Sequence, residues 1–106
     1  MDENTRINRL LAFLKEDPAD SFSAHALALE YVKLGKLDEA ETLWTQLLHR
    51  DKNYVGSYYH IGKLFEQKGN ADSAVKYYRE GIAIAAQLSA KHAQSELQQA
   101  LDELEE

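Results

Sequence analysis

Cysteine is absent from the 106-residue sequence, proline occurs once, at Pro18, and no apolar run approaches the length of a membrane span. Without cysteine the chain can form no disulfide framework, no iron–sulfur cluster and no thiolate metal site. Its apolar stretches are far shorter than the roughly 20 residues that a bilayer requires, and its first residues lack the positive flank and apolar run of a secretory signal. We therefore expect a cytoplasmic protein without a membrane-spanning segment.

Positive charge is also scarce, because 12 lysines and arginines stand against 18 acidic residues and leave a net charge of -6. An acidic chain repels phosphate backbones and anionic lipid surfaces on average. The nearest candidates for a basic patch are Lys33 with Lys36 and His49-Arg50 with Lys52, which have acidic neighbours and are typical of solvated helix faces. The sequence therefore predicts neither a nucleic-acid partner nor a membrane partner.

The usual patterns of catalytic and metal sites are missing as well. The histidines His25, His49, His60 and His92 fall in four separate segments, and none belongs to an HExxH or a repeated Glu-x-x-His motif. His92 and Glu96 are one helical turn apart, a spacing that more often stabilises a helix than holds a metal. There is neither a nucleophile elbow nor a glycine-rich phosphate loop. We predict no catalytic residue, metal or cofactor, which leaves an enzyme as a remote alternative.

What the sequence does contain is helical periodicity, with apolar residues three and four apart between Pro18, Gly35 and Gly69. No segment alternates apolar and polar residues as a strand does. The composition, 44% hydrophobic and 28% charged, is that of a single soluble globular domain. The pattern predicts an all-α fold of about six helices, over residues 4–16, 20–34, 37–50, 54–68, 71 to about 88, and about 90 to 105.

The expected turns have a physical basis. Gly35 and Gly69 stand where a helix that ends in the left-handed conformation requires a residue without a Cβ, and Asn70 suits the N-cap of the next helix. The break expected near Ser89 has no glycine. Ser89 as an N-cap would separate the last two helices, whereas fused helices would free the last one to swing onto a second copy of the chain.

The sequence repeats itself at a spacing of 34 residues. Four pairs at this spacing are identical: Ser23 and Ser57, Gly35 and Gly69, Asp38 and Asp72, and Ala40 and Ala74. Five more keep size and polarity: Leu27 and Ile61, Ala28 and Gly62, Tyr31 and Phe65, Trp44 and Tyr78, and Leu48 and Ile82. Repeats of this length are typical of stacked pairs of helices.

The repeated residues resemble the pattern of the tetratricopeptide-repeat family, in particular its small bacterial-type members. The matching residues, which the resemblance implies are structural, are Leu27, Ala28, Tyr31, Gly35, Ala40 and Trp44 in the first unit and Tyr58, Ile61, Gly62, Phe65, Gly69, Ala74 and Tyr78 in the second. Ala24 departs from the family's tryptophan, and Lys52 from its closing proline. Small residues at Ala28 or Gly62 would let two helices approach while the aromatic side chains fill the space between layers.

The resemblance implies a right-handed solenoid of antiparallel helix pairs that acts as a protein-binding scaffold. It divides a single domain, residues 1–106, into an N-terminal helix from a partial repeat (4–17), two full repeats (21–54 and 55–88) and a C-terminal capping helix (90–105). The apolar residues of that cap recur on one face, as the terminal unit of a solenoid requires.

In this family the first helix of each pair lines the concave surface. Residues of those helices that the repeat pattern does not use are therefore the candidates for partner contact: Phe22, His25, Leu29 and Val32 from one helix, and Tyr59, Lys63 and Glu66 from the next. Only Lys63 among them is cationic, so we expect a peptide or protein segment recognised by apolar and aromatic contacts. The apolar Phe22, Leu29 and Val32 could instead be covered by the N-terminal helix or by a second copy of the chain, as a homodimer.

Overall fold

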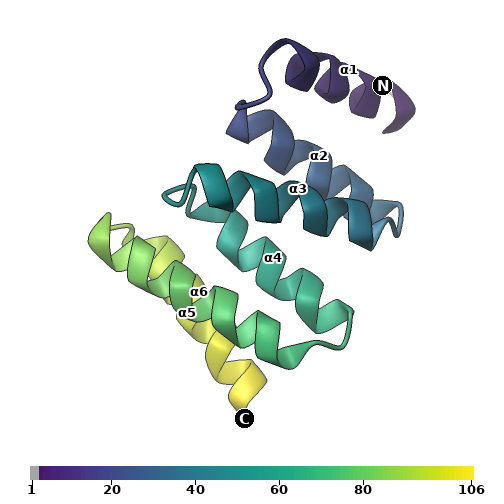
Figure 1. Ribbon diagram of the computed structural model, residues 1–106. Helices are drawn as coiled ribbons and strands as arrows, with labels where there is room; N and C mark the ends of the chain where they lie inside the picture. The colour runs from purple at the N-terminus through teal and green to yellow at the C-terminus, as the bar shows by residue number, and fades with distance from the viewer. Residues whose placement is uncertain (1–2) are drawn as a thin grey trace. The chain divides into compact units, whose positions relative to one another are not determined.

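The computed structural model describes residues 3–106, and within them the chain forms six helices and no strand (Figure 1). The helices are α1 (Glu3–Glu16), α2 (Ser21–Lys33), α3 (Leu37–Arg50), α4 (Gly56–Gln67), α5 (Ala71–Gln87) and α6 (Lys91–Glu105). The all-α prediction is confirmed, and helix α4 begins at Gly56, two residues later than expected. The chain divides into two compact units, residues 1–51 and 52–106, which are described separately below.

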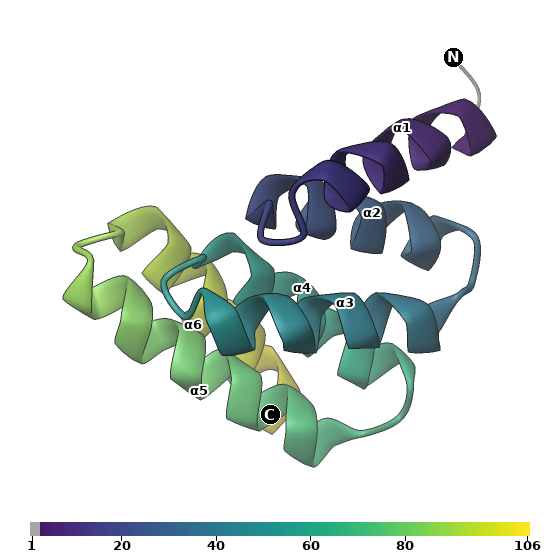
Figure 2. The same cartoon turned by 45° about the horizontal axis from the view of Figure 1, so that its top comes forward.

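In the first unit, α2 packs against both α1 and α3 (Figure 2). Ile7 and Leu10 of α1 form a core cluster with Ala26 and Leu27 of α2, and Tyr31 packs against its edge. Periodic leucines and alanines make such a face because residues three and four apart lie on one side of a helix. Helix α1 therefore covers the side of α2 that carries Ala26.

Two further contacts stabilise the first unit. Ala28, Ala40 and Trp44 are buried, so small side chains let α2 and α3 approach around a large one. The hydroxyl of Ser21 at the start of α2 donates to a carboxylate oxygen of Asp51 after α3, at 2.8 Å. This bond joins two ends that are 30 residues apart in the sequence.

In the second unit, α5 packs against α4 on one side and α6 on another (Figure 1). The close contacts between α4 and α5 depend on two glycines. A Cβ at Gly62 of α4 would lie 2.6 Å from Cδ1 of Tyr78, and a Cβ at Gly81 of α5 would lie 2.6 Å from Cβ of Tyr58. Because real Cβ atoms essentially never come so close, these glycines let the aromatic rings lie directly on the facing backbone.

The turns follow one hydrogen-bonding pattern. Gly35 and Gly69 have φ angles of 75° and 79°, and the amide of Asn70 donates to the Phe65 carbonyl at 2.8 Å, across the end of α4. The side chain of Asn70 accepts from the Ser73 amide, which confirms its expected role as the N-cap of α5.

The break near Ser89 uses the same pattern, so α5 and α6 are separate helices and the fused alternative is wrong. Ser89 is not the N-cap, contrary to our expectation, because Ala90 occupies that position without a side-chain bond. Instead, Ser89 takes the left-handed conformation with φ of 55°, and the Ala90 amide donates to the Ala85 carbonyl at 2.9 Å. Serine here fills the place that glycine has at the two earlier turns.

Candidate functional site

The candidate face on α2 combines one exposed apolar side chain with two that are partly buried. Phe22 is 70% exposed, and the side chains of Leu29 and Val32 are partly buried. None of these three belongs to the core cluster of the first unit, as far as the structure describes it. Together the three residues form an apolar strip on α2, in which the aromatic ring of Phe22 is exposed.

His25, on the same face, is held by the core beneath it. The indole Nε1–H of Trp44 donates to Nδ1 of His25 at 3.0 Å, and the two ring centroids are 5.8 Å apart. Trp44 is only 1% exposed, so its N–H depends on this acceptor rather than on water. The bond requires that Nδ1 of His25 carries no proton. His25 therefore satisfies a buried donor in addition to any contact with a partner.

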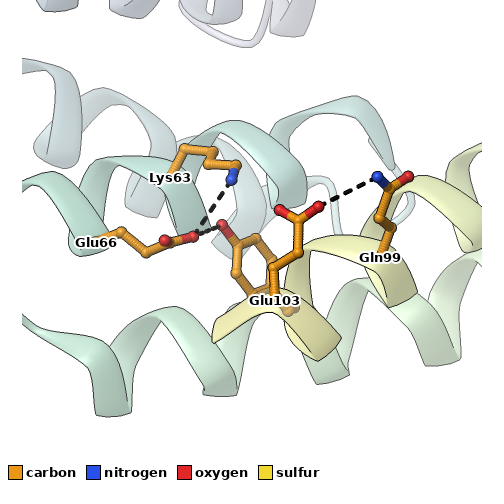
Figure 3. A network of polar contacts seen from close by, with 5 residues as sticks. Lys63, Glu66, Gln99 and Glu103 are labelled. Atoms are coloured by element: carbon orange, nitrogen blue, oxygen red, sulfur yellow. Dashed lines mark hydrogen bonds and ion pairs between the residues drawn. The ribbon is translucent and has the colours of Figure 1, made fainter. Parts of the chain in front are cut away.

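On α4, three predicted residues form a connected group. The ammonium of Lys63 lies 5.6 Å from the centre of the Tyr59 ring. It also lies 3.6 Å from Oε2 of Glu66 (Figure 3). The hydroxyl of the buried Tyr78 on α5 donates to the same Glu66 carboxylate. Burial, reinforced by the negative charge of Glu66, raises the pKa of Tyr78, which therefore stays protonated and acts as the donor.

Helix α6 completes a hollow beside this group. The hollow has a volume of about 170 Å³ and is lined by Tyr59 and Lys63 from α4 and by Glu96, Gln99, Ala100 and Glu103 from α6. In Figure 3 the side chains of Gln99 and Glu103 project from α6 on the side of Lys63 and Glu66. The amide of Gln99 donates to Glu103 at 3.2 Å and holds that carboxylate in place.

The charge in the hollow is predominantly negative. Lys63 is the one cationic side chain that lines it, and its ammonium is paired with Glu66. His60 on α4 feels the charge of Glu96, yet burial outweighs that attraction and lowers the pKa of His60. His60 is therefore neutral near pH 7 and does not offset the carboxylate of Glu96.

The structure thus brings together the three α4 residues predicted from the sequence, whereas the four α2 residues belong to the first unit. Sequence reasoning missed the contribution of α6, because it treated this helix only as a cap. The signal was present: Glu96, Gln99 and Glu103 are three and four residues apart, flanking the apolar face that carries Leu97 and Leu101.

Within residues 3–106, no three histidine, aspartate or glutamate side chains are grouped so that they could hold a metal ion. No helix in this range combines the length and the apolar character needed to cross a bilayer.

Comparison with known proteins gives a consistent result. A family model described as tetratricopeptide repeat matches residues 25–89. The crystal structure of a tetratricopeptide repeat domain protein from Salinibacter ruber is 38% identical, with a TM-score of 0.77, and the alignment covers 81% of this chain and 96% of that one.

Two further matches add to this. A segment of 52 residues, 49% of this chain, is 40% identical to neutrophil cytosol factor 2 from Bos taurus, of which it spans only 10%. The crystal structure of PcrH in complex with the chaperone binding region of PopD has a TM-score of 0.88, covering 96% of this chain and 77% of that one. At 18% identity this last similarity concerns the fold alone.

Proposed function

Because this chain belongs to the tetratricopeptide-repeat family, whose folds generally mediate protein–protein interaction, we propose that it is a non-catalytic scaffold that binds a peptide or protein segment. The contacts are made by the first helices of its repeats, through Phe22, His25, Leu29 and Val32 on α2 and Tyr59, Lys63 and Glu66 on α4. In this proposal, residues 21–54 and 55–88 are the two repeats of one domain, with residues 4–17 as a partial repeat and 90–105 as a cap.

The observation that carries the proposal is the open hollow between α4 and α6. Two of the residues named from the α4 sequence pattern, Tyr59 and Lys63, line it. Concave sites with an aromatic wall and a few fixed polar groups are the usual form of a recognition site. Gln99 and Glu103, joined by a hydrogen bond, supply such fixed groups from α6.

On α2, the exposure of Phe22 supports the same function. A phenylalanine that is 70% exposed is a large apolar surface in contact with water, and burying it against a partner is favourable by roughly 25 cal/mol per Å². Aromatic side chains are also common among the residues that dominate binding energy at interfaces. Similarity to a PcrH structure solved with a segment of another protein agrees with this use of the fold.

A selection from a phage-displayed random-peptide library tests the proposal. Peptides that bind the wild-type chain should lose most of their affinity for Leu29→Asp and Tyr59→Ala, measured by fluorescence polarisation. Leu88→Asp is the matched control, because Leu88 is exposed beyond the end of α5 and outside both faces. Circular dichroism should show unchanged helix content in all variants. Peptides that bind all three variants equally would contradict the assignment of these faces.

A homodimer is the second candidate, and the exposed apolar strip of Phe22, Leu29 and Val32 favours it. Light scattering after gel filtration over a wide concentration range distinguishes the two. A constant monomer mass favours a foreign segment as the occupant. A dimer that Leu29→Asp dissociates and Leu88→Asp does not would assign the strip to self-association.

A further inference from the structure

The hollow between α4 and α6 has a charge that its own residues do not balance. Two carboxylates, Glu96 and Glu103, line it together with one ammonium, that of Lys63. The ammonium lies 3.6 Å from a third carboxylate, Glu66, so its charge is already taken up. Two carboxylates consequently face the hollow without a compensating cation among the residues that line it.

We propose that this hollow is the receptor for an arginine side chain of the bound segment. The inference rests on the proposed function and adds to it the chemistry of the partner. An arginine is complementary in charge to Glu96 and Glu103, and its planar guanidinium presents several N–H donors to fixed carboxylate oxygens. The wall formed by Tyr59 and Ala100 suits the arginine's aliphatic stem and the flat face of its guanidinium.

The carboxylates near the hollow are already oriented before a ligand binds. The amide of Gln99 donates to Oε1 of Glu103 at 3.2 Å, which leaves the other carboxylate oxygen for an incoming donor. Glu66, which pairs with Lys63 beside the hollow, is oriented by the hydroxyl of the fully buried Tyr78. Acceptors that are already held in place lose less side-chain entropy on binding, which favours recognition of one cationic group.

The aromatic wall attracts cations, as the chain itself demonstrates. The ammonium of Lys63 lies 5.6 Å from the centre of the Tyr59 ring. A volume of about 170 Å³ provides space for a side chain rather than for a folded domain, so the occupant is a single residue of a longer segment. Arginine is favoured over lysine because its broad, weakly hydrated head forms paired hydrogen bonds and stacks on aromatic rings.

The direct test uses N-acetyl-arginine amide as the probe and the 12.1 kDa chain labelled with ¹⁵N. In heteronuclear NMR spectra, its addition should shift the amide signals of Tyr59, Lys63, Gln99 and Glu103, and the shift should saturate. N-acetyl-citrulline amide, which has the same shape and no charge, should produce no saturable shift. Added salt should weaken the binding of the arginine probe.

Two double variants remove the same number of negative charges, one from the hollow and the other from the surface outside it. Glu96→Gln with Glu103→Gln should weaken binding of the arginine probe by at least about tenfold, because the loss of even one charge-assisted hydrogen bond has an effect of that size. The matched control is Glu39→Gln with Glu80→Gln, at two exposed sites outside the hollow, and it should bind the probe as the wild type does. All four residues are exposed, so these variants should retain the wild-type fold.

The inference is overturned if citrulline produces the same shifts as arginine, if the arginine shifts spread over the acidic surface, or if the two paired variants bind alike. An absence of any shift overturns it too. The proposed function is tested separately by the peptide selection. Selected peptides that need Tyr59 and Leu29 but contain no essential arginine would leave that function standing while refuting the arginine site.

Discussion

Replacing Gly62 by alanine should destabilise the second unit, because the absence of a Cβ is what lets Tyr78 lie against α4. The added carbon would lie 2.6 Å from Cδ1 and 2.7 Å from Cζ of the Tyr78 ring. The ring cannot easily retreat, since Tyr78 is fully buried and its hydroxyl is bound to Glu66. The change must therefore force either the ring or the helix to move.

The expected magnitude follows from two opposing effects. Alanine in a helix interior is favoured over glycine by about 1 kcal/mol. Overpacking a dense core costs about 1–3 kcal/mol, and a clash with a fixed aromatic ring belongs at the upper end. We expect a net loss of about 2 kcal/mol in the free energy of unfolding, measured by urea denaturation followed by far-ultraviolet circular dichroism.

Gly56→Ala is the matched control on the same helix. No atom lies within 4 Å of a Cβ added at Gly56, so this variant should be as stable as the wild type or slightly more so. A second control combines Gly62→Ala with Tyr78→Leu, where a smaller side chain makes room, so the combined loss should be less than additive. Equal stability of Gly62→Ala and Gly56→Ala would refute the close approach of α4 and α5.

Three further predictions concern single residues. Ser89→Gly should stabilise the chain by about 0.5–1 kcal/mol, because glycine adopts the positive φ at this turn more readily; a loss of stability in urea denaturation would contradict this. Glu30 is 4% exposed and pairs with Arg6 at 3.4 Å and with Lys33 at 2.9 Å. Glu30→Gln should therefore destabilise the first unit by about 1–3 kcal/mol, reported by fluorescence of the chain's single tryptophan, and unchanged unfolding would argue that these ion pairs contribute nothing. Burial lowers the pKa of His60, so the unfolded chain binds a proton at this histidine more tightly than the folded chain does. The stability that depends on neutral His60 is therefore fully present above about pH 6.5 and is lost as the pH falls through the lowered pKa. His60→Gln should therefore be less sensitive than the wild type to a change from pH 7.5 to 5.5, and equal sensitivity would refute the assignment.

Most of the fold could be predicted because the signals for it are local. Helices α3 and α5 begin where the apolar periodicity and the acidic first turns place them, at Leu37 and Ala71. Ser89 shows the limit of this approach. Its side chain suits an N-cap, but the backbone hydrogen bonds that close the end of α5 require a left-handed residue there. The serine side chain favours the N-cap position, whereas the end of α5 needs a residue with positive φ, and Ser89 adopts the positive φ.

The candidate site was predictable only in part. Tyr59 and Lys63 could be named because the repeat pattern does not use them and they share one face of their helix. The bond between Trp44 and His25 could not be foreseen, since the indole of a core residue finds its acceptor 19 positions away. Nor could the residues of α6 be assigned to the hollow, because a cap is defined by its apolar face.

By itself the sequence determined the six helices, the 34-residue period and the family, since each depends on the spacing of side chains along one segment. Tertiary packing decided which polar groups meet. Tyr59 and Glu103 line the same hollow although they lie on different helices. The spacing of residues along one helix contains no information about which residue of another helix lies close to it. The approach of α4 and α5 at Gly62, together with α6 packed on α5, places Glu96 and Glu103 in the same hollow as the ring of Tyr59.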